Sequence, residues 1–370
     1  LVLDEPTANL DPRAASAFFH TLTRLKAELG MTIVLIEHRL DAVLPLVDHI
    51  VALNRQGQVM AEGAPRAIFA AHADDLERAG VWLPMTCRLM RAVRRRGAQT
   101  DGCPLMMDEV VAALRAKQPV ALRPEQREAA QPPQPAPAIS LTDLTFAYPD
   151  SPPALRGVNL HIGRGSFFAL VGGNGSGKTT LAKHLVGLLR PTSGVATVLG
   201  QDASRRRPSE LAQQVGYVFQ NPEHQFVTER VADELAYSLR GRWRHEEIAA
   251  RVADLARRFG LQGYEDDNPF SLSQGQKRRL SVATMVALNQ PILILDEPSF
   301  GQDQESTAAL MSTLKELHAS GVTIVFISHD MQLVAEYADD VAVLHEGSVI
   351  FRGPPRALFA RADVLEQAAL

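Results

Sequence analysis

GGNGSGKT, residues 172–179, is preceded by the apolar run SFFALV and followed by a segment with helical periodicity. The stretch fits G-x-x-x-x-G-K-[ST] in the strand–loop–helix context that this phosphate-binding motif requires. Its glycines allow successive backbone N–H groups to point inward around phosphate oxygens without obstruction from a Cβ atom. We expect Lys178 to reach the β- and γ-phosphates of a nucleotide and Thr179 to ligate Mg²⁺, beside the positive end of the helix dipole. The residues predicted to hold the nucleotide here are Gly172, Asn174, Gly175, Ser176, Gly177, Lys178, Thr179 and Thr180.

Two further strand-like runs downstream end in acidic residues and a histidine. PILILDE places Asp296 and Glu297 at the end of an apolar strand, and TIVFISH ends the next strand at His329. At the edge of a parallel sheet, Asp296 is expected opposite the phosphate loop, where it holds the Mg²⁺ shell through water. Glu297 is then placed to polarise a water in line with the γ-phosphate, and His329 to donate to that phosphate or orient the water. The alternative is structural, with the carboxylates as strand-end caps and His329 as a packing residue.

The segment around Asp296 occurs twice, whereas the phosphate loop occurs once. LVLDEPTANLD at 1–11 matches LILDEPSFGQD at 293–303, and TIVLIEH at 32–38 matches TIVFISH at 323–329. GAPRAIFA and GPPRALFA extend the match at a nearly constant separation, which indicates a duplicated domain. The first residue is not Met. We therefore expect one complete copy and the back half of another, whose front half with its own phosphate loop is missing.

The repeat and the composition shifts divide the chain into three parts. Residues 1–70 are read as the remnant of the first copy, 71–138 as a linker and 139–370 as the complete copy. Strands that alternate with helices indicate an α/β domain with a largely parallel sheet. The linker is basic and then Pro-rich, and its short helix at 107–116 can pack on either domain. Its basic cluster is a solvated helix face or a contact for anionic lipid or a partner, and comprises Arg88, Arg91, Arg94, Arg95 and Arg96.

Composition excludes several classes of protein. The 370 residues are 46% hydrophobic and 22% charged with a net charge of -4, which is typical of a globular protein and gives no reason to expect a nucleic-acid partner. The two cysteines, Cys87 and Cys103, lack metal-like spacing and cannot form a disulfide framework, which favours a reducing cytosol. No apolar run approaches the roughly 18–20 residues that a membrane span requires.

SLSQGQKRR at 271–279 resembles the LSGGQ signature of ATP-binding cassette (ABC) ATPases, with Gln274 where glycine is usual. The other motifs of that family follow in order: Tyr148 for the aromatic that stacks on adenine, Gln220 for the Q-loop, Asp303 for the D-loop and His329 for the switch histidine. The resemblance implies an α/β P-loop NTPase with an ABC-type nucleotide-binding domain: a mostly parallel core sheet, an antiparallel β subdomain and a helical signature subdomain. It implies hydrolysis of ATP with Mg²⁺, where Gln220 joins Thr179 and Asp296 around the metal.

In this family two cassettes face each other head to tail, and each ATP lies between one phosphate loop and the other signature. Ser273, Gly275 and Gln276 would therefore serve a nucleotide held by a second ABC domain in trans. The missing front half would carry both the first phosphate loop and the first signature, so neither composite site is expected to close within this chain. What remains of the first copy is Asp4, Glu5, Asp11 and His38.

NPEHQF after Gln220 and FGQD in the D-loop resemble the ATPases of energy-coupling factor importers. IEHRLD around His38 and the fusion of two cassettes are similar to the tandem type assigned to hydroxymethylpyrimidine and thiamine import. This resemblance implies an ATP-binding subunit that drives uptake of a vitamin, a vitamin precursor or a metal ion. It would lie on the cytoplasmic face of the membrane, with residues 221–226 near the groove that grips an integral scaffold, and a separate component would bind the substrate. The alternatives are a soluble tandem cassette acting on the ribosome, another cassette importer and a non-catalytic binding module.

Overall fold

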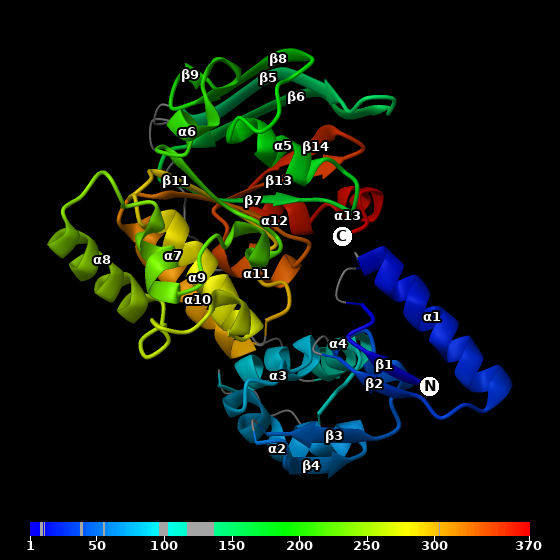
Figure 1. The fold of residues 1–370 in the computed structure, drawn as a ribbon. Coiled ribbons are helices and arrows are strands. Elements are labelled where there is room, and N and C mark those ends of the chain that lie inside the picture. Colours follow the sequence, from blue (N-terminus) through cyan, green and yellow to red (C-terminus); the bar gives the residue numbers. More distant parts are fainter. Residues whose placement is uncertain are drawn as a thin grey trace. The chain divides into compact units, whose positions relative to one another are not determined.

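The computed structural model describes residues 1–7, 10, 12–37, 40–54, 56–95, 103–116, 137–302 and 304–370 (Figure 1). Asp11, His38, Arg96, Asp303 and most of the Pro-rich run lie outside the described residues. The chain divides into two compact units, residues 1–130 with 303–305 and residues 131–302 with 306–370. No helix among the described residues is long and apolar enough to cross a membrane.

The second unit is built on a sheet of six strands in the order β10-β11-β12-β7-β13-β14. All neighbouring strands run parallel except β14, which is antiparallel to β13. Runs such as Phe167–Val171 and Ile292–Asp296 are apolar and buried throughout, as expected for parallel strands covered on both faces. The strands are β7 (Phe167–Val171), β10 (Val215–Val218), β11 (Ile292–Asp296), β12 (Thr323–Ile327), β13 (Asp340–His345) and β14 (Ser348–Gly353).

Alternate side chains of this sheet enter two separate cores. Phe167 and Phe326 pack with the helices of one side, whereas Phe168 and Val325 pack with an antiparallel sheet and α5 (Lys178–Leu185) of the other side. Figure 1 shows these two layers on opposite sides of the core sheet. The antiparallel sheet consists of β5 (Pro137–Ala147), β6 (Pro153–Gly163), β8 (Ser193–Val198) and β9 (Gln201–Asp202). The other helices are α6 (Pro208–Leu211), α7 (Val231–Tyr237), α8 (His245–Arg258), α9 (Gln274–Val286), α10 (Gln304–Ala319), α11 (Met331–Tyr337), α12 (Pro355–Phe359) and α13 (Ala362–Ala368). The predicted three-part cassette architecture is confirmed.

The first unit repeats the closing strands of the second in the same register. Val2 pairs with Val34 in parallel, as the matching Ile294 pairs with Val325. An antiparallel hairpin follows in both units, β3 with β4 here and β13 with β14 there. The strands and the intervening helix of the first unit are β1 (Val2–Asp4), α1 (Pro12–Leu29), β2 (Val34–Ile36), β3 (Ile50–Leu53) and β4 (Val59–Gly63).

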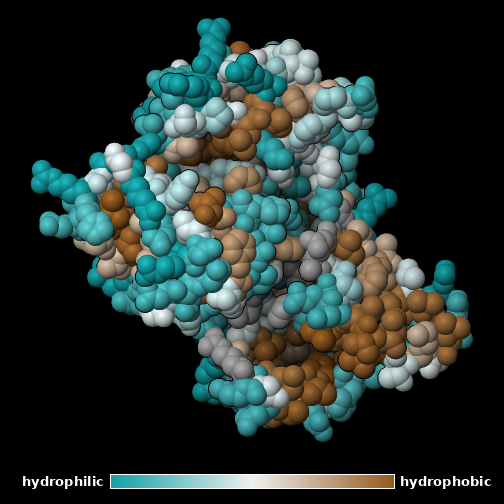
Figure 2. All heavy atoms as spheres, in the orientation of Figure 1, coloured by the Kyte–Doolittle hydropathy of each residue, from teal (hydrophilic) through white to brown (hydrophobic). Residues whose placement is uncertain are grey.

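One face of these first-unit strands is apolar and exposed. Val2, Val34 and Ile36 are 70%, 51% and 50% exposed, and Val51 and Leu53 are similarly open. Figure 2 shows hydrophobic side chains gathered over this unit. The positions that match them in the second unit are buried against the antiparallel sheet and α5, and they are Ile294, Val325, Ile327, Ala342 and Leu344. The strands of the first unit therefore pair in the same register as those of the second unit. Among the described residues, however, the first unit has no counterpart of the antiparallel sheet and helix α5 that cover these strands in the second unit.

Of the predicted linker, residues 71–95 and 103–116 fold with the first unit, whereas residues 137 and 138 begin β5 of the second unit. The helices of the linker, together with α2 (Pro65–Arg78), are α3 (Met85–Arg95) and α4 (Met107–Ala116). Arg66 of α2 forms an ion pair of 2.7 Å with Glu109, which places α4 on this unit. In the basic cluster, Arg94 and Arg95 are exposed as a solvated face would be. Arg91 instead is largely buried and pairs with Asp74 and Glu77 of α2, because α3 packs its apolar side onto that helix.

Candidate nucleotide-binding site

Four neighbouring parallel strands of the second unit end at one edge of the sheet, and the predicted site residues follow them. The phosphate loop follows β7, Gln220 follows β10, Asp296 ends β11 and His329 comes after β12. Carboxyl ends of parallel strands are the usual position of ligand sites in α/β sheets. A cavity of about 310 Å³ lies here, which is within the range of small-molecule sites. Its lining consists of Tyr148, Ala154, Asn174, Gly175, Gly177, Lys178, Thr179, Thr180, Gln220, Asp296 and Glu297.

The phosphate loop requires glycine at two positions for reasons of space and conformation. Gly172 and Gly177 have φ of 149° and 105°, in the region that favours glycine. A Cβ atom at Gly172 would approach the carbonyl oxygen of Leu344 to 2.1 Å, and one at Gly177 would approach that of Ala154 to 2.6 Å. These glycines therefore let the loop wrap tightly against its neighbours. No side chain caps the following helix α5 at Gly177, which leaves this helix N-terminus available to an anion.

Lys178 places a buried cation inside this loop. The residue is only 8% exposed, and its Nζ donates to the carbonyl oxygens of Gly172 at 2.7 Å and Gly173 at 2.8 Å. A buried ammonium is costly unless it is paired or hydrogen-bonded. The position of Lys178 within the loop, in the lining of the cavity, brings this charge within reach of an anionic ligand there. The loop therefore fits a polyphosphate.

Asp296 is held by two hydroxyl groups in a buried position. Thr179 Oγ1 donates to Asp296 Oδ2 at 2.8 Å, and the Tyr217 hydroxyl donates to the same oxygen at 3.2 Å. Burial raises the pKa of Asp296, and the hydrogen bond from Thr179 opposes that shift. Among the described residues no three His, Cys, Asp or Glu side chains cluster to hold a metal. A hydroxyl and one carboxylate are nonetheless a fitting protein contribution for Mg²⁺, which takes further oxygen ligands from phosphates and water.

Glu297 and His329 form a direct pair next to Asp296. His329 Nδ1 donates to Glu297 Oε1 at 3.0 Å, and both side chains are largely buried. The backbone of Glu297 has a φ of 48°, an unfavourable conformation for a residue with a side chain. Such strain is retained where the surroundings fix it, and it is common at functional sites. Glu5, the matching residue of the first unit, has a φ of 42°. The repeat therefore preserves the backbone conformation as well as the sequence.

Tyr148 and Gln220 lie at the rim of the same cavity. Tyr148 is 38% exposed, and its hydroxyl lies 3.2 Å from Thr180 Oγ1. Phe146 supports the ring from its edge, with ring centroids 4.9 Å apart. The ring is thus fixed and accessible, which suits stacking on a planar base. Of the predicted loop residues, Gly172 and Ser176 belong to the loop without lining the cavity.

The signature residues lie outside this cavity, at the start of α9. Ser273 caps the helix by accepting from the Gln276 backbone N–H at 3.3 Å, while the Gln276 side chain accepts from the Ser273 N–H at 2.8 Å. A Cβ at Gly275 would lie 2.8 Å from Ser306 Oγ, so the start of α9 approaches α10 closely. Gln274, the departure from the family pattern, is exposed. The second unit therefore gathers around one cavity most of the residues predicted to bind phosphate, but not the predicted signature residues.

Two cations that the sequence reasoning missed connect α9 to the site. Arg278 is 1% exposed and donates to the backbone carbonyl oxygens of Phe219 at 2.6 Å, Gln220 at 2.5 Å and Glu297 at 3.3 Å. Burial lowers the pKa of Arg278 to about 10, and the Asp296 and Glu297 charges oppose that shift. The guanidinium therefore stays charged at neutral pH.

Lys277 makes the second connection. Its Nζ donates to Glu223 Oε1 at 2.6 Å, and Gln225 in the same segment donates to the Ser281 carbonyl at 2.8 Å. The segment after Gln220 is thereby fixed along the signature helix. The only local signal for these contacts was a run of three cations at 277–279, directly before a mostly apolar stretch of the helix at 280–286. The sequence did not indicate the contact between Tyr217 and Asp296, because a tyrosine within a buried strand is typical of a hydrophobic core.

Comparison with known proteins identifies several similar chains. The sequence model described as ABC transporter matches residues 155–300. The chain is 36% identical over 369 residues to the putative HMP/thiamine import ATP-binding protein YkoD of Bacillus subtilis, which aligns with all of this chain and 64% of the relative. A putative ABC transporter ATP-binding protein of Methanosarcina acetivorans is also 36% identical, again over all of this chain and 62% of the relative. The chain thus spans a little under two thirds of the length of these curated relatives.

Two solved structures resemble about three fifths of this chain. CbiO1 of Clostridium perfringens, part of the ABC transporter complex cbiONQ, is 33% identical and superposes with a TM-score of 0.57 over 62% of this chain and 93% of that chain. A dimeric ATP-binding cassette in a post-hydrolysis state, bound to ADP and Pi, is 26% identical with a TM-score of 0.54, over 59% of this chain and 99% of that chain.

Proposed function

The chain belongs to the ABC transporter ATPase family, and from that premise we propose that its second unit binds Mg-ATP and hydrolyses it to drive import through a membrane partner. The observation that carries the proposal is the single cavity that joins the phosphate loop, Asp296 and Glu297. An anion-binding loop, an oxygen pair for Mg²⁺ and a carboxylate for water activation are the parts that ATP hydrolysis needs.

Different residues of the chain bind the base, the phosphates and the metal ion. Tyr148 stacks on the base, and Lys178 with the loop N–H groups holds the phosphates. Thr179, Asp296 and Gln220 hold Mg²⁺, which when bound neutralises charge on the phosphate oxygens. The hydroxyl of Tyr217 fixes the Asp296 carboxylate that Thr179 also contacts, so the position of this oxygen is set before any ligand arrives.

Glu297 and His329 act on the attacking water. The ionised carboxylate of Glu297 accepts a proton from the water as the water attacks the γ-phosphate. His329 donates through Nδ1 to Glu297 Oε1, which orients the carboxylate and fixes which ring nitrogen carries the proton. The strained backbone at Glu297 and the Arg278 bond to its carbonyl oxygen hold this carboxylate in one place.

The second unit supplies only one side of a complete site. Ser273, Gly275 and Gln276 lie at an exposed helix N-terminus, away from the unit's own cavity. We place them against a nucleotide held by another ABC domain, where the hydroxyl, the N–H groups and the helix dipole favour the γ-phosphate. Asp303, outside the described residues, joins this contact as the D-loop. Hydrolysis therefore depends on a signature supplied in trans.

Residues 1–70 serve as the back half of a first cassette. The support is the shared strand register and the apolar face that an antiparallel sheet and a phosphate-loop helix cover in the second unit. A segment with those two elements fits this face and would bring a signature for the second unit. The remainder of 71–138 beyond α4 then serves as the connection between cassettes.

The membrane partner engages the segment 221–226 on the cytoplasmic face of the membrane. Lys277 and Gln225 fix this segment to α9, so displacement by a partner would reach the signature directly. The import direction and a small nutrient as cargo rest on similarity to the relatives that are named for import and for the cbiONQ complex. A separate membrane component binds that cargo. Neither those relatives nor the described residues support the ribosome-acting alternative.

A binding experiment tests the core of this function. Titration calorimetry of the full chain with Mg-ATP is expected to show binding that Lys178→Ala abolishes. Lys183→Ala on the same helix α5, outside the cavity, is the matched control and is expected to bind as wild type does. Binding by Lys178→Ala equal to the wild type, or no binding by the wild type at millimolar nucleotide, would contradict the proposal.

A further inference from the structure

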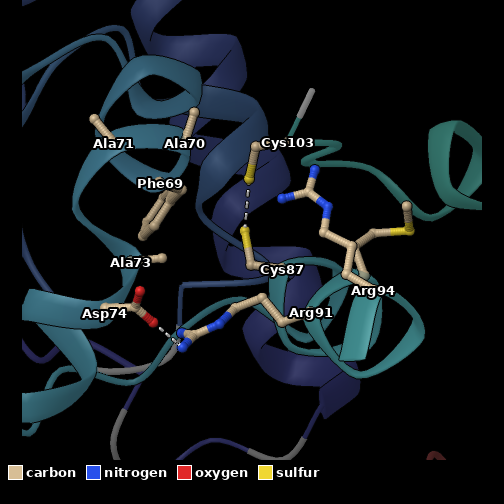
Figure 3. Close-up of a pocket in the computed structure, with 10 residues that line it drawn as sticks. Phe69, Ala70, Ala71, Ala73, Asp74, Cys87, Arg91, Arg94 and Cys103 are labelled. Carbon is tan, nitrogen blue, oxygen red and sulfur yellow. Dashed lines mark hydrogen bonds and ion pairs between the residues drawn. The ribbon is translucent and has the colours of Figure 1, made fainter. Parts of the chain in front are cut away.

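The first unit contains a smaller cavity, of about 130 Å³, that takes no part in the proposed ATPase. It has room for a few molecules of the size of water. Figure 3 shows that Cys87 and Cys103 line it with their sulfur atoms facing each other, that the Arg94 side chain lies beside the sulfur atoms, and that Arg91 reaches to Asp74. The two cysteines come from different elements, since Cys87 lies on α3 and Cys103 precedes α4.

The two thiols are held at a reactive distance inside the core of the first unit. Cys87 Sγ and Cys103 Sγ are 3.1 Å apart, and the residues are 2% and 7% exposed. Both belong to the apolar cluster that includes Phe69 and Leu83. A disulfide bond is about 2 Å long, so the sulfurs need to approach by only about 1 Å to bond. Sequence spacing alone gave no reason to bring them together.

The charges around the pair favour a thiolate at Cys103. The hydrogen bond with Cys87 and the guanidinium groups of Arg94 and Arg66 lower the pKa of Cys103, against the effects of burial and Glu109. The pKa of Cys87 is raised well above its usual value, first by its hydrogen bond to Cys103 and then by burial and the neighbouring charges of Cys103 and Asp41, so this thiol keeps its proton. Arg91 cannot leave the cavity wall easily, because Asp74 and Glu77 hold it. A thiolate beside cations, next to a second thiol, has the charge environment of redox-active cysteines, and the cavity that both cysteines line is what would give a small oxidant access to them.

We propose that Cys87 and Cys103 form a reversible oxidation site, at which a peroxide converts the two thiols into an intramolecular disulfide. The Cys103 thiolate attacks one peroxide oxygen, the O–O bond breaks, and hydroxide leaves as a sulfenic acid forms on Cys103. The Cys87 sulfur then attacks the Cys103 sulfur, the S–S bond forms and the S–O bond breaks. The departing hydroxide takes the Cys87 proton as water. The two thiols lose two electrons, and the peroxide is reduced to water.

The bond would join α3 to the segment that leads into α4. Both elements already pack on α2 and the hairpin of the first unit, so the disulfide would lock this unit in its folded arrangement. A dithiol reverts to the reduced state when a small thiol reductant is present. In a reducing compartment such pairs are transient and sense oxidants, which agrees with the composition of the chain.

The test uses the full chain and hydrogen peroxide. After treatment and removal of oxidant, the protein is alkylated with iodoacetamide under denaturing conditions, and the Cys87 and Cys103 peptides are measured by mass spectrometry. The proposal expects loss of both alkylated peptides, appearance of a Cys87–Cys103 linked peptide, and recovery of both with dithiothreitol. The thermal unfolding midpoint is expected to rise with oxidation and to return on reduction. Full alkylation of both cysteines after peroxide, or links only between molecules, would overturn it.

Variants separate the roles of the two thiols. Cys87→Ser is expected to stop at a sulfenic acid on Cys103 that a dimedone probe labels, whereas Cys103→Ser is expected to give little labelling at Cys87. Arg94→Gln keeps both thiols and is expected to slow disulfide formation several-fold, with Arg95→Gln on the same helix as the control. Equal labelling of the two serine variants would refute the assigned order. Circular dichroism and thermal unfolding of each reduced variant report whether the first unit is folded, and Mg-ATP binding reports only on the second unit.

Discussion

Replacing Arg278 by methionine is expected to weaken both the fold of the second unit and its catalysis. The methionine side chain retains most of the buried volume of Arg278, so packing changes little. Methionine has no hydrogen-bond donor in its side chain, so the carbonyl oxygens of Phe219, Gln220 and Glu297 lose the hydrogen bonds that the Arg278 guanidinium donates to them. Each buried carbonyl without a partner lowers the free energy of unfolding by about 1–3 kcal/mol. The removal of a buried charge offsets part of this loss, because that charge no longer has to be desolvated on folding. We expect the free energy of unfolding to fall by about 2–4 kcal/mol.

Catalysis should fall for a separate reason. Arg278 connects the backbone of Gln220 and Glu297 to α9, so its loss frees the two residues that are proposed to position Mg²⁺ and the attacking water. Urea unfolding followed by circular dichroism, fitted with one transition for each unit, gives the stability, and phosphate release gives the turnover. Arg258→Met, an exposed arginine on α8, is the control and should change stability by less than about 0.5 kcal/mol. Wild-type stability together with wild-type turnover in Arg278→Met would refute the positioning role.

Further outcomes follow from the same geometry. Glu297→Gln should bind Mg-ATP yet hydrolyse it at least about 100-fold more slowly, because the amide cannot accept the proton of the attacking water; phosphate release equal to the wild type would rule out a general base at this position. Tyr217→Phe removes one of the two hydroxyls on Asp296 Oδ2, so the Mg²⁺ concentration for half-maximal ATP binding should rise roughly tenfold. Thr197→Val, a change on β8 remote from the cavity, serves as the comparison, and an unchanged Mg²⁺ requirement in Tyr217→Phe would contradict the role of the hydroxyl.

The parts of the molecule that depend on local patterns were predictable from the sequence. The run ILILD before Glu297 is apolar throughout, and a strand buried on both faces follows from that pattern. Because parallel strands end at one edge, placing Gln220, Asp296 and the phosphate loop in one cavity followed from the order of the motifs. The family resemblance and the cassette fold are confirmed. The roles of the individual site residues stay predictions.

Contacts between distant segments were not predictable. Arg278 and Tyr217 act on the site through groups far away in sequence, and neither a charged run nor a strand tyrosine indicates which atom it will meet. Cys87 and Cys103 meet because α3 packs on the first unit, whereas composition gave that region the appearance of a linker. The contacts of Arg278, of Tyr217 and of the cysteine pair all depend on how side chains pack in three dimensions, and residue spacing along the sequence does not predict that packing.

ATP hydrolysis by the second unit is proposed to need a signature from another cassette. The most direct measurement mixes two variants of the full chain, Lys178→Ala, which lacks the phosphate-binding lysine, and Ser273→Arg, which blocks the signature. Each alone is expected to release phosphate at background rate. In a mixed pair, one site combines an intact phosphate loop with an intact signature, so turnover should reappear on mixing and rise with protein concentration. Full turnover by Ser273→Arg alone, or no recovery in a mixture of two variants that both remain folded, would contradict the account.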